Sequence, residues 1–390
     1  MSDQPNKRQS YWRRILGQTF LRWGARLGLL WVTILALVGV FAPFLASSFP
    51  LLLSQGGELS SPVLEHLQPV DVLFLAAFFT LLLLIPLRTS LARKLGLLAA
   101  VLAVSAVIAY SWVSPPKLVI YEQYRVAEAE GRYDWVLHAP VPFSPKDYQR
   151  DRGDTGLEAP LSNGERKHWF GTEQNGADVL SRMIHASRIA LGIGFVATGI
   201  AMLLGVIIGG LMGYFSGVVD ILGMRLVEIF EAVPTLFLLL TFVAFFGRSL
   251  YIMMVIIGIT SWPGYARYVR AEFLRLRRQD FVQAAEAAGL PLTSILFRHM
   301  LPNGMGPVLV AASFGVAAAI LAEATLSFLG LGLVDDPSWG EMLNQAVQSS
   351  SFNWWMAAFP GGAIFFTVFA YNLIGEALRD AIDPYLSKSG

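Results

Sequence analysis

The sequence lacks several of the residues and motifs on which enzymes and metal proteins depend. It contains no cysteine, which excludes a disulfide framework, a thiolate nucleophile and a cysteine-ligated zinc or iron–sulfur site. Its histidines are scattered and show no ligand spacing such as HExxH; they are His66, His138, His168, His185 and His299. No GxxxxGK[ST] loop is present to hold ATP phosphates. We therefore expect no catalytic residue, no metal site and no cofactor, and we expect that this chain is not an enzyme.

Charge is also scarce. Charged residues make up 15% of the chain and hydrophobic residues 55%, and the mean hydropathy is +0.54. This balance is far from that of a soluble domain and indicates an integral membrane protein. The net charge of +1 conceals basic clusters that are separated by apolar runs, and no nucleic-acid partner is expected from it.

Long apolar runs are the dominant feature that is present. A bilayer core about 30 Å thick needs roughly 20 apolar residues in a helix, and about eight stretches approach that length. They are residues 27–53, 70–87, 95–113, 189–214, 219–246, 251–268, 304–329 and 355–377. The sequence therefore predicts an all-α integral membrane protein with about eight transmembrane helices, surrounded by membrane lipid.

The basic residues predict the orientation and the domains. Lys and Arg of short loops stay in the cytoplasm, and they cluster before the first span, in the turn RTSLARK and around residues 267–298. Both termini are then cytoplasmic, as a basic N-terminus (1–26) and a short C-terminus (380–390). Residues 27–113 hold the N-terminal spans, including a hairpin, and the polar segment 114–188 is extracytoplasmic. Residues 189–379 form the membrane core, with a cytosolic loop at 270–303.

One part of this loop, DFVQAAEAAGLPLTSILFRHMLPN (280–303), has the pattern of a short helix in water. Asp280 is a good N-cap, and Gln283 is placed to complete a capping box. Gly289 and Pro291 end the helix, and a second short turn is expected to run as far as Pro302. So short a helix is unstable alone and needs a surface on which to pack.

The small side chains of this helix indicate how it packs. Phe281, Ala284, Ala285 and Ala288 share one face at i, i+3, i+4 and i+7 spacing, and small residues allow another backbone to approach closely. This face predicts docking to a partner. The alternative is a helix that lies parallel to the membrane and rests on its own bundle.

The same residues resemble the EAA loop of bacterial ABC importer permeases, whose helix inserts into a groove of the ATP-hydrolysing subunit. The family's EAA triplet falls on Gln283, Ala284 and Ala285, so glutamine replaces the usual glutamate, and Glu286-Ala287-Ala288 is a near copy out of register. Glutamine lacks the charge that favours a helix N-terminus by about 0.3–1 kcal/mol. The resemblance implies that the ATPase-coupling residues are Asp280, Phe281, Gln283, Ala284, Ala285, Glu286, Ala288, Gly289, Leu301 and Pro302.

Further segments resemble the peptide, opine and nickel subgroup, in particular its OppC/DppC-like permease half. They are HWFGTEQNGADVL (168–180), ATLSFLGLGLVDDPSWGEML (324–343) and ALRDAIDPYL (377–386). The resemblance implies a core of five or six helices. The hairpin within 70–113 departs from this pattern, and the long external segment resembles that of the YejE-like permeases. It also implies an OppB/DppB-like second permease subunit, two ATP-binding subunits and an extracytoplasmic substrate-binding protein.

Ionisable residues inside spans are costly and are candidates for function. Glu228 and Glu231 share a face just before Pro234, where a conduit lining and an ion pair between subunits are equally favoured. Glu323 is a candidate for the translocation path, with a hydrogen-bonded helix contact as its alternative. Asp220 and Arg225 are expected to pair or snorkel. The glycines at 205, 209 and 213 are expected to allow close helix packing.

The function expected from these features is that of a permease subunit of an ATP-driven ABC importer in the bacterial inner membrane, carrying short peptides or peptide-like solutes. A nickel or opine solute would suit the same architecture. Two other classes remain open: a proton-coupled secondary transporter that uses the membrane glutamates, and a membrane scaffold whose cytosolic helix only recognises a partner.

Overall fold

The computed structural model describes residues 15, 17–87, 89–116, 119–152, 156–162, 167–333, 336–349, 351 and 353–382. The chain divides into two compact units. The first unit comprises Met1–Thr33, Ile189–Asp335 and Gly362–Gly390, and the second comprises Ile34–Arg188 and Asp336–Gly361. Expectations about residues 1–14, Arg88 and residues 383–390 concern positions outside the described part of the chain.

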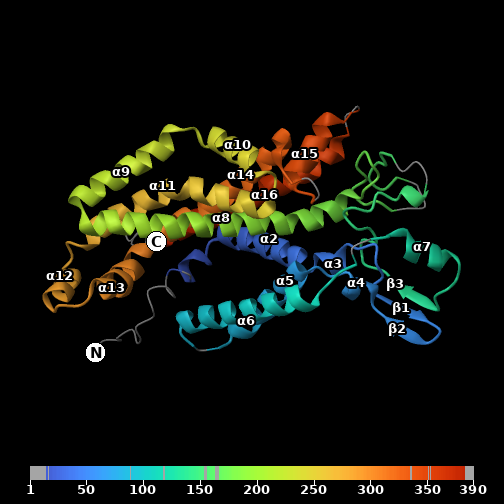
Figure 1. Ribbon diagram of the computed structural model, residues 1–390, viewed down its shortest axis with the longest axis horizontal. Coiled ribbons are helices and arrows are strands. Elements are labelled where there is room, and N and C mark those ends of the chain that lie inside the picture. The colour runs from blue at the N-terminus through green and yellow to red at the C-terminus, as the bar shows by residue number, and fades with distance from the viewer. Residues whose placement is uncertain are drawn as a thin grey trace. The chain divides into compact units, whose positions relative to one another are not determined.

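Most of the described chain is helical (Figure 1). The long helices are α2 (Trp23–Val40), α5 (Pro69–Leu84), α6 (Leu91–Trp112), α8 (Val179–Phe215), α9 (Gly217–Ala232), α10 (Thr235–Phe246), α11 (Leu250–Leu276), α14 (Leu301–Leu326) and α16 (Trp354–Ile382). The short helices are α3 (Ala42–Leu45), α4 (Pro62–Glu65), α7 (Glu122–Ala129), α12 (Asp280–Ala287), α13 (Leu292–Ser294) and α15 (Trp339–Gln348). A 3-10 turn lies at Arg150–Arg152, and π-helical turns lie at Ile295–Met300 and Ser327–Leu331.

The number of membrane-spanning helices differs from the expected eight. Among the described residues, five helices are long and apolar enough to cross a membrane, and α9 with α10 makes a sixth if this bent pair is one span. The five are α2, α6, α8, the continuous helix Leu292–Leu331 and α16. α5 is apolar but has only 16 residues, and α11 is not among the five. A count of eight is therefore not confirmed by length and composition.

The run expected as one span at 219–246 is broken. α9 and α10 meet at a bend of 80°. Pro234 stands immediately before α10, and Val233 is in the extended conformation. A proline lacks the N–H that would continue the helix and disfavours the helical conformation of the residue before it. The bend therefore follows from the Val233-Pro234 pair.

In the first unit, α8 and α11 pack backbone to backbone. A Cβ atom on Gly205 would lie 2.4 Å from the Tyr265 Cβ, and one on Gly209 would lie 2.3 Å from the Ala266 carbonyl oxygen. A Cβ on Gly213 would lie 2.5 Å from the Phe273 Cβ. The expectation that these glycines allow close packing is confirmed. Such contacts between helices at small residues are typical of membrane bundles.

The first unit also brings the beginning of α2 to the end of α16. Arg22 forms an ion pair with Asp380, and Trp31 donates a hydrogen bond from its indole nitrogen to Thr367 Oγ1 at 3.1 Å. Between these contacts, a Cβ on Gly28 would lie 2.6 Å from the Ala370 carbonyl oxygen. Residue numbers rise along α2 as they fall along α16, so the two helices are antiparallel.

The second unit contains a small antiparallel sheet of order β2-β1-β3, with β1 at Leu52–Gln55, β2 at Glu58–Ser60 and β3 at Trp135–Leu137 (Figure 1). Gly56 and Gly57 both have positive φ, as a two-residue hairpin turn requires. The expectation of one span over 27–53 is therefore wrong at its end. α2 stops at Val40, and the apolar residues near 52 belong to a strand.

A buried ion pair fixes the hairpin of α5 and α6 within the second unit. Arg188, in the first part of α8, lies 2.5 Å from a carboxylate oxygen of Asp71 in α5, and both side chains are largely buried. The Arg188 guanidinium also lies 4.9 Å from the centre of the Phe74 ring. By contrast, only 6% of the apolar stretch of α6 is buried. α5 is thus the anchored helix of the hairpin, and α6 presents nearly all its apolar surface outward.

Candidate functional site

The loop at 270–303, expected to be cytosolic, contains the helix α12 (Asp280–Ala287), whose N-terminal cap differs from the expected one. Gln279 occupies the N-cap position, and no side chain caps the helix. Asp280 is the first helical residue, so the predicted capping box of Asp280 with Gln283 is wrong. The helix start is shifted by one residue because the Gln279 carbonyl accepts the first bond, from the Gln283 N–H at 3.1 Å. Asp280 still places a negative charge at the positive end of the helix.

The face that α12 turns to its own bundle includes one residue that was expected to face a partner. Val282 and Ala285 are buried, at 0% and 6% exposure. They belong to an apolar cluster with Phe273, Ile295 and Met300. Ala285 is therefore a packing residue of the bundle, and the four-residue face predicted from helical spacing is rotated relative to the true one.

The opposite face of α12 is open, and apart from Phe281 its side chains are small or polar. Its exposed residues include Phe281, Gln283, Ala284, Ala287 and Ala288. Ala287 was not among the predicted coupling residues. The spacing of Gln283, Ala284 and Ala287 could have indicated this face, had Val282 been recognised as the buried anchor of the helix.

The C-terminal end of α12 is closed by Gly289, as the sequence predicts. Gly289 has φ of +68°, and its N–H donates to the Glu286 carbonyl at 2.9 Å. The Leu290 N–H donates to the Ala285 carbonyl at 3.2 Å. This pair of bonds around a left-handed glycine is the Schellman arrangement. It fixes the direction in which the chain leaves the helix.

The second part of the loop does not end at Pro302 as expected. α13 runs into the π-helical turn at Ile295–Met300, which continues directly into α14 at Leu301. Leu301 is half-buried and Pro302 is exposed in the first turn of α14. The loop is therefore continuous with α14.

Side chains also fasten α12 to the end of α8. The Tyr214 hydroxyl donates to Glu286 Oε1 at 3.0 Å. The Arg277 guanidinium lies 5.7 Å from the centre of the Tyr214 ring and donates to Ser216 Oγ at 3.0 Å. Glu286, the glutamate of the near copy, thus holds α12 from one side, and the exposed Gln283 does not.

The three predicted path residues form contacts within the chain. Glu228 pairs with Arg225 one turn earlier, and Glu231 pairs with Arg267 of α11. Glu323 is 2% exposed and accepts a hydrogen bond from Ser327 Oγ at 2.6 Å. Asp220, expected to pair, is held by two bonds from the Arg270 guanidinium. Within the described residues, no group of His, Asp and Glu side chains is placed to hold a metal ion.

The chain is similar to known transport proteins over the part that contains these features. The family model described as "Binding-protein-dependent transport system inner membrane component" matches residues 205–388. The dipeptide transport system permease protein DppC of Alkalihalophilus pseudofirmus is 36% identical over 243 residues, which is 62% of this chain and 80% of that protein. The oligopeptide transport system permease protein OppC of Escherichia coli is 40% identical over 251 residues, which is 64% of this chain and 82% of that protein.

Among solved structures, an inward-facing MetNI methionine ABC transporter is similar with a TM-score of 0.44 and 16% identity, over 52% of this chain and 96% of that chain. The sequence relatives are much closer, and the family match includes α12, the Gly289 turn and α14. The chain is thus an integral membrane protein of the all-α class, and it belongs to the family of binding-protein-dependent transport system inner membrane components, as an OppC/DppC-like permease.

Proposed function

We propose that this protein is the permease subunit of a peptide ABC importer, and that it forms the path for short peptides together with a second permease. Its likeness to oligopeptide and dipeptide permeases supports the substrate class. ATP hydrolysis is supplied by two partner subunits, and an extracytoplasmic binding protein delivers the peptide. The single observation that carries the proposal is α12, a short helix within the matched family region that is packed on one face and open on the other.

The contacts of α12 suit it to transmit motion. A helix that is to move a membrane bundle must be fastened to it, because a helix that slides transmits nothing. Val282 and Ala285 fasten it through buried packing, Glu286 through Tyr214, and the π-helical turn at Ile295–Met300 through continuity with α14. A movement of the ATPase groove against the open face would therefore move the ends of α8 and α14.

The first test of this function is purification of the complex. A tagged chain is expected to carry ATP-hydrolysing subunits with it, and vesicles containing the complex and its binding protein are expected to accumulate radiolabelled tri-alanine only when ATP is inside the compartment with those subunits. Uptake driven by a proton gradient without ATP would favour a secondary transporter. A stable complex that neither hydrolyses ATP nor takes up peptide would favour a scaffold.

Contacts within each unit also support the orientation. The pairing of β1 with β3 supports one side of the membrane for residues near 54 and 135, in which case the hairpin of α5 and α6 between them crosses it an even number of times. The Arg22–Asp380 pair likewise supports one side for the N-terminal end of α2 and the C-terminal end of α16. Eight crossings, with α9 and α10 as one, satisfy both conditions. We infer cytoplasmic termini, a peripheral lipid-facing α6 and an extracytoplasmic segment 114–188.

Because the chain has no cysteine, single cysteines report this topology without background. Arg132→Cys, an exposed position beside the sheet, is expected to react with a membrane-impermeant maleimide in intact spheroplasts. Arg278→Cys, exposed before α12, is expected to react only in inverted vesicles. The reverse pattern would invert the proposed orientation and remove α12 from the cytoplasm.

A further inference from the structure

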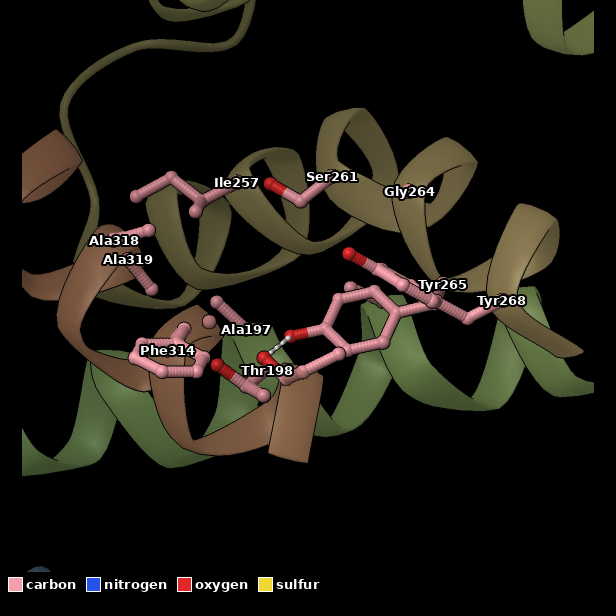
Figure 2. Close-up of a pocket in the computed structure, with 13 residues that line it drawn as sticks. Ala197, Thr198, Ile257, Ser261, Gly264, Tyr265, Tyr268, Phe314, Ala318 and Ala319 are labelled. Atoms are coloured by element: carbon pink, nitrogen blue, oxygen red, sulfur yellow. Dashed lines mark hydrogen bonds between the residues drawn. The ribbon is translucent and has the colours of Figure 1, made fainter. Parts of the chain in front are cut away.

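The membrane bundle of the first unit contains a pocket of about 300 Å³ that none of the predicted path residues lines. It lies among α8, α11 and α14 (Figure 2). Small residues make most of its wall, including Ala197 and Ala201 of α8, Gly264 of α11, and Ala311, Gly315 and Ala318 of α14. The space therefore exists because each of the three neighbouring helices contributes glycine or alanine to its wall.

One contact shows that the pocket has a specific shape. The Tyr265 hydroxyl donates to the Ala311 carbonyl oxygen at 3.4 Å, and the side chain is only 6% exposed. A Cβ on Gly315 would lie 1.7 Å from that hydroxyl oxygen. Tyr265 therefore needs the glycine in order to lie across α14, and its ring forms one wall of the pocket.

The chemistry of the wall restricts what the pocket can hold. Four hydroxyl groups reach it, from Thr198, Ser261, Tyr265 and Tyr268, and Phe314 adds an aromatic face. Figure 2 shows Ser261 and Tyr268 on the α11 side, and Phe314 and Ala318 across from them. No charged side chain lines it. A charged group would enter without a counter-ion at large cost, so the pocket suits an uncharged group with apolar bulk.

The mouth of the pocket indicates that it opens toward a polar medium rather than toward lipid. Ser261, Gly264 and Tyr268 follow one another at i, i+3 and i+7 on α11, and Ser261 and Tyr268 are exposed. Glu272 and Arg275 follow along the same face, and the Arg275 guanidinium nitrogen lies 2.7 Å from a Glu272 carboxylate oxygen. A lipid-facing stripe of a spanning helix is apolar, and a polar stripe is typical of a face toward water or another subunit.

We propose that this pocket receives one uncharged aromatic or aliphatic side chain of the transported peptide, with Ser261 and Tyr268 bonding the adjacent peptide group; this rests on the proposed function. Its volume lies at the lower end of the 300–1,000 Å³ typical of ligand pockets, which suits one side chain rather than a whole peptide. The hydroxyls favour a peptide over a lipid acyl chain, since an acyl chain has no hydrogen-bond donor or acceptor to pair with them. Glu228, Glu231 and Glu323 do not line this pocket.

The test compares two cargoes in the complete transporter, reconstituted with the same binding protein throughout. Ala318→Leu fills the mouth of the pocket, and Ala271→Leu adds the same bulk at an exposed position of α11 outside it. Ala318→Leu is expected to reduce uptake of alanyl-alanyl-phenylalanine about 10-fold or more relative to tri-alanine, because a single methylene in an apolar pocket is already worth roughly 10–200-fold in discrimination. Ala271→Leu is expected to leave that ratio at its wild-type value.

The hydroxyls are tested separately. Ser261→Ala and Tyr268→Phe are each expected to lower uptake of both peptides by a similar factor of about 2–10, as expected for the loss of one hydrogen bond. An unchanged uptake ratio in Ala318→Leu overturns the proposal. If native mass spectrometry then finds a lipid in the wild-type complex that is absent from Ala318→Leu, while the uptake ratio is unchanged, the pocket holds lipid and the proposal is overturned. If the wild-type complex takes up neither peptide, the proposed function itself fails. If the wild type transports both peptides and Ala318→Leu has the same uptake ratio as the wild type, only the pocket proposal fails.

Discussion

Replacing Ala284 with arginine is expected to lower peptide uptake by at least about 100-fold while leaving the membrane bundle folded. Ala284 lies on the open face of α12, away from the buried Val282 and Ala285. A long charged side chain there would hold the ATPase groove away or lose its hydration in the contact. An unpaired charge buried in an interface costs about 3–5 kcal/mol, which corresponds to a loss of at least 100-fold in docking. The measurement is uptake together with the ATPase activity retained by the purified complex.

Two matched variants separate docking from general damage. Ala284→Ser keeps the small size and is expected to retain most of the uptake. Ala271→Arg adds the same charge at an exposed position on α11 and is expected to bind the ATP-hydrolysing subunits normally. Ala285→Arg is not a suitable probe, because Ala285 is buried and its replacement would detach α12 from the bundle. Normal uptake and normal subunit binding in Ala284→Arg would show that α12 is not the docking helix.

Replacing Gly209 with alanine is expected to destabilise the packing of α8 against α11. The added methyl would lie 2.3 Å from the Ala266 carbonyl oxygen and 2.9 Å from the Ala266 Cα, both of which are backbone atoms that cannot rotate away. Overpacking of this kind costs about 1–3 kcal/mol and more where backbone must shift. The purified complex is expected to lose several degrees in its thermal unfolding midpoint and to accumulate at a lower level.

Gly199, on the same helix, provides the control. A Cβ there meets nothing within 4 Å, so Gly199→Ala gains the same helix propensity as Gly209→Ala without a collision. It is expected to be neutral or stabilising. If the two variants unfolded at the same temperature, the close approach of α8 to α11 would not be a source of stability.

Local patterns predicted the parts of the fold that depend on local chemistry. The glycines of α8, the end of α12 at Gly289 and most helix positions follow from spacing and residue type, which act within a few residues along the chain. The rotation of α12 about its own axis, by contrast, cannot be predicted from these local patterns. Whether Val282 or Phe281 is buried depends on Phe273 of α11 and on Ile295 and Met300 of the π-helical turn, which are two other segments of the chain.

For the candidate path residues, too, the sequence does not reveal which residue on another helix each side chain contacts. An acid inside a span is conspicuous in sequence, but its partner is not: Glu231 is paired with Arg267 and Asp220 with Arg270 on another helix. The pocket of α8, α11 and α14 is the reverse case. Alanine, glycine and hydroxyl residues look unremarkable in a membrane sequence, and they define a space only where three helices bring them together.

The leucines before residue 55 predict the end of a membrane span, but the structure has a β-hairpin there. Leu52 and Leu53 belong to β1, which pairs with β3, a strand about 80 residues later in the sequence. Only the Gly56-Gly57 turn signals the hairpin locally. A single apolar run of this length does not distinguish a strand from a helix end.

The pairing of Leu53 with Val136 also sets an order of events during synthesis. β1 leaves the ribosome before α5 and α6, and its second edge stays open until both helices and α7 have followed. At about 5–20 residues per second this delay lasts several seconds. During that time the strand is an exposed template for pairing with other chains. Rapid membrane insertion of the hairpin of α5 and α6 would shorten the period in which the nascent permease is prone to aggregate.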